Sequence, residues 1–349
     1  MPSLPSIDTS FLTIFLVDLL NTPSPTGNAE PAVAFVEQTL KQYPELTLSR
    51  TRKGALVARW EGRKNDAPRA LTAHVDTLGA MVKEVKPNGR LKLSRIGGIL
   101  LNGIETEGCW VLASNGKKVR GSFMFNDASV HVHGASVNET KRSEDNMEMR
   151  LDALTTSADQ TRELGIRVGD FVVFDPRVEV TEGFVRSRFL DDKACVACIV
   201  AAIKSLHDAG FKPQQTIYFH FSNYEEVGHG AAAGIPAEVH ELLAVDMAAV
   251  GDGQESDEFH ASLCVKDSGG PYHHEMSNRL RALADDYDIP FKTDIYPYYN
   301  SDGEAFWRAG GNVAVALIGP GVDASHNYER THTDALVATS NWLLAYLLS

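Results

Sequence analysis

Acidic and imidazole side chains recur in this sequence at one kind of place, directly after an apolar segment with the composition of a β-strand. Carboxylates brought together there would repel one another unless a cation neutralised them, and a mixture of nitrogen and oxygen ligands suits zinc or a similar divalent ion. The candidate metal ligands found in this way are His74, Asp191, Glu226, Asp246 and His326. The pattern therefore predicts a catalytic metal centre.

The number of candidate ligands indicates two divalent metal ions per chain. Two ions that share a bridging carboxylate need about five protein ligands and one further carboxylate that acts as a base. Glu225 is the carboxylate left over beside Glu226, so we expect it to be the general base. Asp76 follows His74 by two residues, and its carboxylate could orient the imidazole ring. Zinc is the expected metal, although these ligands also accept cobalt or manganese.

Each of these residues also has an ordinary structural interpretation. A single His or Asp after a strand usually belongs to a turn or caps a helix, and adjacent acids are usually solvated. The prediction of a metal centre therefore depends on the whole set. The residues alone do not separate Asp191 from Asp192 as the bridging ligand.

The elements that must position these side chains form an α/β pattern. Strands are expected at 68–73, 215–222, 242–249, 261–265, 291–296 and 313–318, and helices at 193–209, 271–287, 302–309 and 334–348. Such alternation predicts an α/β fold with a mixed sheet covered by helices on both faces. Ligands of such sheets bind beyond the strand ends, where the candidate residues lie.

A different pattern separates two parts of this α/β chain. From about residue 87 to residue 176, short β-like pieces alternate with polar turns rich in glycine and asparagine. We interpret 87–176 as a small inserted domain resembling a β-barrel. The catalytic domain is then formed by 1–86 and 177–349 together.

The composition restricts the function classes. The chain has 349 residues, with 33 Lys and Arg against 46 Asp and Glu, so its net charge is −13. This acidic balance would repel phosphate backbones and argues against nucleic-acid binding. The apolar run at 11–20 is too short to span a bilayer and lacks a preceding basic segment, so neither membrane association nor a signal peptide is expected. Four cysteines indicate a reducing, cytoplasmic compartment.

Five motifs in order resemble a known family. They are AHVDTLGAMVKEV (73–85), FLDDKA (189–194), YEEVGHGA (224–231), LAVDM (243–247) and SHNYERTH (325–332). They are similar to the di-zinc aminopeptidase family that includes glutamyl aminopeptidases and tetrahedral aminopeptidases, over nearly the whole chain. PSPTG, DNMEMRLD and YYNSD further resemble the subgroup associated with synthesis of the osmoprotectant N-acetylglutaminylglutamine amide. Cys195 and Cys198 depart from the glycine and alanine expected there.

The resemblance implies a role for each candidate residue. His74 and Asp246 would hold one metal, Glu226 and His326 the other, and Asp191 would bridge them. Glu225 would take a proton from the metal-bridging water, which attacks the carbonyl of the peptide bond, and would pass it to the leaving amine. The implied reaction is removal of the N-terminal residue from short peptides. The inserted domain would drive assembly into a homo-oligomer, a tetrahedral dodecamer in the family, and limit substrate access.

Three other functions remain open from the residues. A related amidohydrolase would use the same metals on N-acyl amino acids or osmolyte amides. A catalytically silent metal-binding scaffold would keep the ligands, but the intact Glu225 argues against it. A glycosidase would need Glu225 and Glu226 to flank one bond, whereas adjacent residues of an extended segment point to opposite sides.

Several remaining residues have weaker claims to function. Cys195 and Cys198 match a redox or half-zinc spacing, but both lie on an apolar helical face and are expected in the core. His131 and His133 are expected at the surface or an interface. Arg330 could bind a substrate carboxylate or pair with Glu329.

Overall fold

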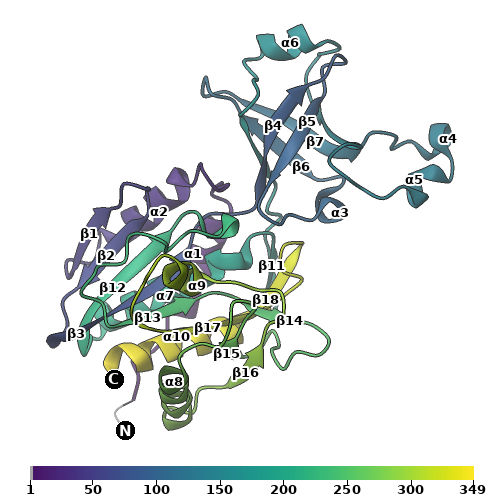
Figure 1. Cartoon of the computed structure of the whole chain (residues 1–349). Helices are drawn as coiled ribbons and strands as arrows, with labels where there is room; N and C mark the ends of the chain where they lie inside the picture. Colours follow the sequence, from purple (N-terminus) through teal and green to yellow (C-terminus); the bar gives the residue numbers. More distant parts are fainter. Residues whose placement is uncertain (1–2) are drawn as a thin grey trace. The chain divides into compact units, whose positions relative to one another are not determined.

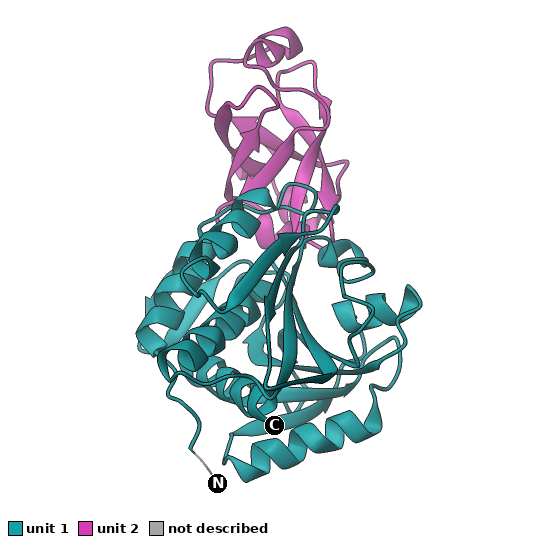
Figure 2. Cartoon of the chain, turned by 90° about the vertical axis from the view of Figure 1, so that its left-hand side faces the viewer, with its two compact units in different colours: residues 1–77, 177–349 teal, residues 78–176 magenta. Residues whose placement is uncertain are grey.

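The computed structural model describes residues 3–349 and contains two compact units (Figure 2). One unit comprises the described residues up to Thr77 together with Arg177–Ser349, and the other is Leu78–Pro176. The first is built on a mixed sheet and the second on a closed barrel, so the predicted fold class is confirmed. The barrel unit begins at Leu78, whereas the sequence assigns residues up to 86 to the catalytic domain.

The sheet of the first unit contains twelve strands among the described residues, and its main path runs in the order β1-β2-β12-β3-β13-β17-β18-β11-β10. Strands β14 and β15 pair with β17, and β16 pairs with β15. The strands are β1 Leu46–Arg50, β2 Leu56–Trp60, β3 Lys64–His74, β10 Glu179–Thr181, β11 Phe184–Ser187, β12 Gln215–Ser222, β13 Glu241–Val245, β14 Ala248–Val250, β15 Ala261–Lys266, β16 Phe291–Ile295, β17 Ala314–Asp323 and β18 Glu329–His332.

The centre of this sheet is parallel. Strands β12, β3, β13 and β17 run side by side in the same direction, and the register places Ser222 of β12 opposite His74 of β3. Parallel strands buried on both faces are near-continuous apolar runs, as at Leu242–Val245. The chain emerges from several of these strands at one edge, where the predicted ligands follow.

Helices cover both faces of the sheet (Figure 1). Helices α7 and α10 pack together against one face, and α1 packs against α7. On the other face, Phe306 and Trp307 of α9 pack against the core around Ala244 and Leu317. The helices of this unit are α1 Thr9–Leu20, α2 Glu30–Leu40, α7 Leu190–Asp208, the 3₁₀ turn η1 Glu225–Val227, α8 His274–Asp286, α9 Asp302–Arg308 and α10 Thr333–Leu348. No helix within residues 3–349 is long and apolar enough to cross a membrane.

Helix α7 is apolar around most of its circumference because other elements enclose it. Every residue from Leu190 to Ile203 is buried, with the sheet and the helices α1 and α10 packed around the helix. Cys195 and Cys198 are free thiols inside this packing, and Cys198 Sγ lies 3.4 Å from the carbonyl oxygen of Leu336. Both cysteines are therefore core residues.

The second unit is a closed barrel with the strand order β4-β5-β8-β7-β6-β9. Its strands are β4 Gly79–Val85, β5 Leu91–Ile96, β6 Gly108–Leu112, β7 Lys118–Phe125, β8 Met147–Leu151 and β9 Phe171–Phe174, and its short helices are α3 Leu101–Ile104, α4 Val130–His133, α5 Ser136–Glu139 and α6 Ala158–Glu163. Glu148 is buried in this unit and pairs with both Lys86 and Arg90. His131 and His133 lie on α4, which has no buried residue.

Candidate metal centre

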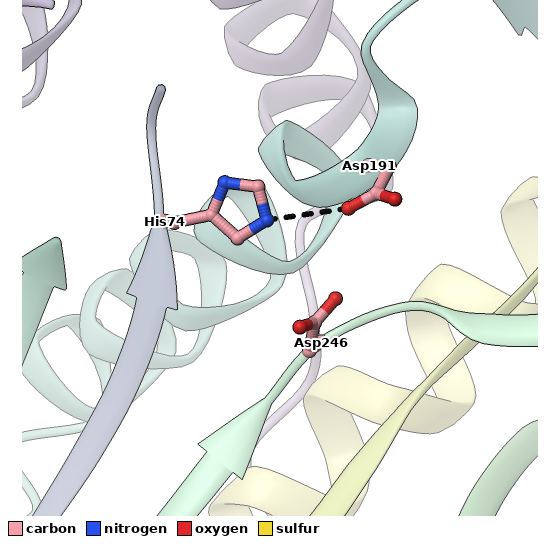
Figure 3. A group of neighbouring side chains, drawn as sticks. All are labelled: His74, Asp191 and Asp246. Carbon is pink, nitrogen blue, oxygen red and sulfur yellow. Dashed lines mark hydrogen bonds and ion pairs between the residues drawn. The ribbon is translucent and has the colours of Figure 1, made fainter. Parts of the chain in front are cut away.

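Three predicted ligands converge at the edge of the sheet, although they come from distant parts of the chain. Figure 3 shows His74 at the end of β3, Asp191 in the first turn of α7 and Asp246 just after β13, with their side chains directed toward one another. One ligand atom from each lies within 4.8 Å of the others, and all three residues are buried. This spacing suits coordination of a common ion.

The backbone around Asp246 explains how its side chain reaches the centre. The sequence predicts one strand over 242–249, but the structure divides it into β13 and β14 with a break at Asp246. The Asp246 N–H donates to Ile318 O (3.0 Å), and a Cβ on Gly319 would lie only 1.8 Å from Asp246 O. Only glycine therefore allows the chain to pass β17 this closely and turn the carboxylate toward His74.

Asp191 lies between two imidazoles. Its Oδ1 is 3.2 Å from His74 Nε2, and its Oδ2 is 3.6 Å from His326 Nε2. The neighbouring Asp192 points elsewhere, because its Oδ2 accepts a hydrogen bond from the backbone N–H of His74 (3.1 Å). The geometry thus separates the two aspartates that the sequence leaves open: Asp191 faces both histidines, and Asp192 supports the strand that carries one of them.

The two adjacent glutamates both face the centre. Glu226 Oε2 lies 3.6 Å from His326 Nε2, and Glu225 Oε2 lies 3.7 Å from His74 Nε2. The sequence treats this segment as extended, which would send the two side chains to opposite sides. Instead they occupy the single 3₁₀ turn η1, where consecutive side chains diverge by about a third of a turn. Each glutamate therefore approaches a different histidine.

The carboxylate of Asp76 binds backbone N–H groups, and its backbone carbonyl oxygen contacts the histidine. The His74 ring nitrogen Nδ1 lies 2.9 Å from the carbonyl oxygen of Asp76, whereas the nearest carboxylate oxygen of Asp76 is 3.6 Å away. The carboxylate instead accepts the N–H groups of Glu225 (3.2 Å) and Glu226 (3.4 Å) and the hydroxyl of Thr26 (2.6 Å). Asp76 therefore orients the ring through its carbonyl group and holds the glutamate turn through its side chain.

Glu329 is a buried carboxylate whose role the sequence does not reveal. It accepts the backbone N–H of His326 (3.0 Å) and that of Asp191 (3.1 Å), so it joins two segments that carry candidate ligands. His326 has φ +66°, a left-handed conformation that costs energy for a residue other than glycine and that this hydrogen bond supports. Of the two roles that the sequence leaves open for Arg330, the ion pair with Glu329 is wrong, because Arg330 pairs with Glu258 (2.8 Å).

Burial and mutual repulsion disfavour the ionised forms of three carboxyls at the centre. They raise the pKa of Glu225 and of Glu226 well above the usual range, with Asp246 acting on Glu225 and Asp191 on Glu226. The same effects raise the pKa of Asp246 to about 8, with Asp191 as the main charged neighbour. These carboxyls would therefore gain much from a nearby cation.

Asp191 and His74 stabilise each other's charge. Burial opposes ionisation of Asp191, but the imidazoles of His74 and His326 outweigh it and lower the pKa of this carboxyl. Burial likewise opposes the imidazolium of His74, but Asp191 and Glu225 raise the pKa of His74 well above its usual value. Without another cation, these carboxylates therefore favour the protonated form of His74.

The donor set fits divalent metal ions. Two imidazoles and three carboxylates converge from five segments, and their nitrogen and oxygen atoms match the preferences of zinc, cobalt and manganese. A divalent ion would replace the proton on His74 and relieve the repulsion among the carboxylates. The arrangement suits hydrolysis, because Glu225 stays beside the ligands as a carboxylate that could accept a proton.

Comparison with known proteins identifies the family. The sequence profile of the M42 glutamyl aminopeptidases matches residues 54–342. The chain belongs to the M42 glutamyl aminopeptidase family. YhfE of Bacillus subtilis strain 168, which is named as an aminopeptidase, is 46% identical over 333 residues, covering 95% of this chain and 96% of YhfE. The M42 assignment makes this protein a metal-dependent peptide hydrolase, as the resemblance predicts.

Solved structures show the same M42 fold. A TET aminopeptidase from a marine sediment archaeon of the Thaumarchaeota superposes with a TM-score of 0.87 at 16% identity, covering 96% of each chain. The TET1 peptidase of Pyrococcus horikoshii superposes with a TM-score of 0.84 at 19% identity, covering 97% of this chain and 99% of the other. That peptidase can assemble into a tetrahedron or a large octahedral shell. At these identities the likeness concerns the fold.

Proposed function

We propose that this M42 protein removes the N-terminal residue of short peptides with two divalent metal ions, and that these ions are zinc. The observation that carries the proposal is the position of Asp191, whose two carboxylate oxygens face two different histidines. A carboxylate placed in this way is suited to bridge two ions. His74 and Asp246 would complete one site, and Glu226 and His326 would complete the other.

The ions and the residues around the two sites have different roles in the proposed reaction. When bound, the ions supply Lewis acidity toward the scissile carbonyl and lower the pKa of water. Glu226 is assigned to the site that contains His326, whereas Glu225 lies beside His74 without being assigned to an ion. Glu225 is therefore the general base. It takes a proton from the attacking water and delivers it to the leaving amine. Asp76 holds Glu225 at this position because its carboxylate accepts the backbone N–H of Glu225.

We further propose that the protein is a homo-oligomer assembled through the barrel unit, Leu78–Pro176. Two findings support this: the barrel is a separate compact unit, and the P. horikoshii peptidase of the same fold can assemble into a tetrahedron or a large octahedral shell. A closed shell would admit only short or unfolded peptides. Oligomerisation is testable by light scattering of the purified protein.

The test of the proposed activity combines metal content with substrate choice. Metal per chain is measured by mass spectrometry, and the same sample is assayed on aminoacyl amides with a free or an acetylated α-amine. The proposal requires about two ions per chain and cleavage of only the free-amine series. Cleavage of the acetylated series would instead identify an amidohydrolase, and absence of metal after reconstitution would reject the ligand assignment.

A further inference from the structure

The segment 224–231, called here the glutamate loop, must hold Glu225 and Glu226 in place, and its two ends are fixed differently. At the start of the loop, Asp76 accepts the N–H groups of both glutamates. After η1 the loop is exposed at Val227–His229 and left-handed at Gly228 (φ +85°). A loop with an exposed middle needs a second attachment where it returns to the protein interior.

We propose that Lys53 and Asp302 together form this second attachment, called here the loop anchor, and that they are positioning residues for Glu225. The inference rests on the proposed role of Glu225 as the general base. The cation of Lys53 binds carbonyl oxygens of the loop, and the carboxylate of Asp302 binds an N–H group of the adjacent residue. Lys53 Nζ donates to the carbonyl oxygens of His229 and Gly230 (2.5 Å for Gly230), and Asp302 Oδ1 accepts the N–H of Ala231 (2.7 Å).

Asp302 also connects the loop to the strands that carry or flank His74. Its Oδ2 accepts the hydroxyl groups of Thr72 (3.2 Å) and Ser222. Thr72 lies two residues before His74 on the same strand, so both side chains are on one face of the sheet. Ser222 ends β12 and pairs with His74 in the register. A single carboxylate thus sets the glutamate loop relative to a candidate metal ligand.

The hydrogen-bond directions around Thr72 are determined by this arrangement. Its hydroxyl donates to the Asp302 carboxylate, so it must accept from His220 Nδ1, which lies 3.0 Å away. Burial lowers the pKa of His220 to about 3 and the charge of Lys53 acts in the same direction, so the imidazole is neutral. His220 therefore carries its proton on Nδ1 and donates it toward Thr72.

Further contacts of Asp302 and Lys53 with the glutamate loop support this assignment. A Cβ on Gly230 would lie 2.1 Å from Asp302 Oδ1, so only glycine lets the carboxylate approach the backbone here. On the other side, Lys53 lies over the ring of Tyr224 (5.7 Å to its centroid), and that ring stacks on His229 (5.4 Å between centroids). Lys53 therefore touches both ends of the loop, and Asn223 Nδ2 returns a hydrogen bond to its carbonyl oxygen (2.8 Å).

The experiment compares four variants with the wild-type protein. Lys53→Met removes both hydrogen bonds of the cation, Lys53→Arg keeps the charge, and Asp302→Asn keeps the shape of the side chain. The matched control is Asp294→Asn, another buried aspartate that accepts a hydroxyl and a backbone N–H, in its case from Ser256, outside the candidate site.

Two measurements are made on each variant. Amide hydrogen exchange of peptides covering 224–231 is followed in metal-free protein, and kcat and KM are measured with saturating metal. We expect at least about tenfold faster exchange in Lys53→Met, because the loop loses both hydrogen bonds to the cation. We expect a smaller increase in Asp302→Asn, because the amide oxygen still accepts the Ala231 N–H but the negative charge is lost. We expect kcat to fall about tenfold to a hundredfold with KM changed less than about threefold, since misplacing a catalytic group by about 1 Å costs about a hundredfold. Lys53→Arg should recover part of kcat.

The outcomes separate the anchor from the proposed activity. Unchanged exchange in both Lys53→Met and Asp302→Asn would overturn the anchor, as would equal effects in Asp294→Asn. If Asp302→Asn does not fold, Ser222→Ala removes one donor to the same carboxylate and gives the same test on a smaller scale. If the wild-type protein does not cleave free-amine peptides, the proposed activity fails, and the exchange measurement still decides whether the anchor exists.

Discussion

Replacement of Glu225 by Gln is the sharpest test of the catalytic assignment, because it changes charge and basicity with almost no change in shape. The backbone N–H that Asp76 accepts is retained. Glutamine cannot accept a proton from water at neutral pH, so the variant removes the base and leaves the five candidate ligands intact. We expect kcat to collapse while the metal content stays near that of the wild type.

The size of the effect follows from the absence of a substitute base among the neighbouring carboxylates. Glu226 lies against His326, and both oxygens of Asp191 face imidazoles. General-base catalysis contributes about 10²–10⁴-fold, and because the neighbouring carboxylates Glu226, Asp191 and Asp246 would be engaged as ligands, the loss should reach about a thousandfold or more. At 1.36 kcal/mol per factor of ten, this corresponds to about 4 kcal/mol of transition-state stabilisation.

The assay uses a free-amine aminoacyl amide at saturating metal, because removing one negative charge weakens the attraction of nearby cations. Glu238→Gln is the matched control, since Glu238 is exposed and accepts the Tyr218 hydroxyl (2.6 Å) away from the centre. A Glu225→Gln variant that keeps more than about a tenth of the wild-type rate would refute the base assignment. Loss of one ion per chain would show instead that Glu225 is a ligand.

Changes at Asp191, Gly230, the barrel unit and His220 should each have a distinct measurable effect. Asp191→Ala should lower the metal content below two ions per chain and abolish turnover, as measured by mass spectrometry and assay; two retained ions would reject the bridge. Gly230→Ala should destabilise the fold by about 1–3 kcal/mol, read as a lower Tm, because its Cβ would overlap Asp302. Deleting 78–176 should give smaller assemblies by light scattering, and unchanged mass would contradict assembly through the barrel. Burial lowers the pKa of His220 to about 3, whereas its pKa in the unfolded chain is about 6.5. The free energy of unfolding is therefore unaffected by the titration of His220 above pH 6.5 and decreases as the pH drops from 6.5 toward 3, because the unfolded chain binds a proton that the folded protein does not. Wild type should therefore lose about 2–3 kcal/mol more than His220→Asn between pH 6.5 and 4.5 in urea unfolding, and parallel curves would contradict this.

The sequence predicts the sheet and the candidate ligands because both depend on local patterns. Apolar runs such as Leu242–Val245 mark buried strands, and polar residues directly after them mark the edge at which ligands bind. His74 and Asp246 are found by this argument alone. The inserted module is visible because short β-like pieces and frequent turns replace the α/β alternation.

Features that depend on the path of a few residues escape the sequence. Nothing local distinguishes an extended segment at 224–226 from the 3₁₀ turn that the structure shows, yet the difference decides where the two glutamates point. The break at Asp246 is similarly hidden, because its cause is the missing side chain of Gly319, more than seventy residues away. Tertiary contacts override local propensity at both places.

The residues that hold the ligands leave the weakest trace in the sequence. Glu329 and Asp302 accept backbone N–H groups, and a backbone group has no residue type that a pattern could reveal. Asp302 is present only as the last letter of the YYNSD resemblance, and Lys53 belongs to no motif. A residue whose partner is a peptide group is found only when the chain has been folded.

The residues that hold the ligands have one arrangement in common. In each case a buried carboxylate accepts a hydrogen bond from the backbone N–H of a residue whose side chain faces the centre. Asp192 does so for His74, Asp76 for Glu225 and Glu226, and Glu329 for Asp191 and His326. Burying so many carboxylates is unfavourable, and each draws its stability from directed N–H donors. Because these donors are peptide groups, the backbone of each ligand segment is fixed independently of the ligand side chain, which is pre-organised to bind cations. The acidic excess at the sheet edge is therefore explained by the need to fix the backbone as well as to bind metal.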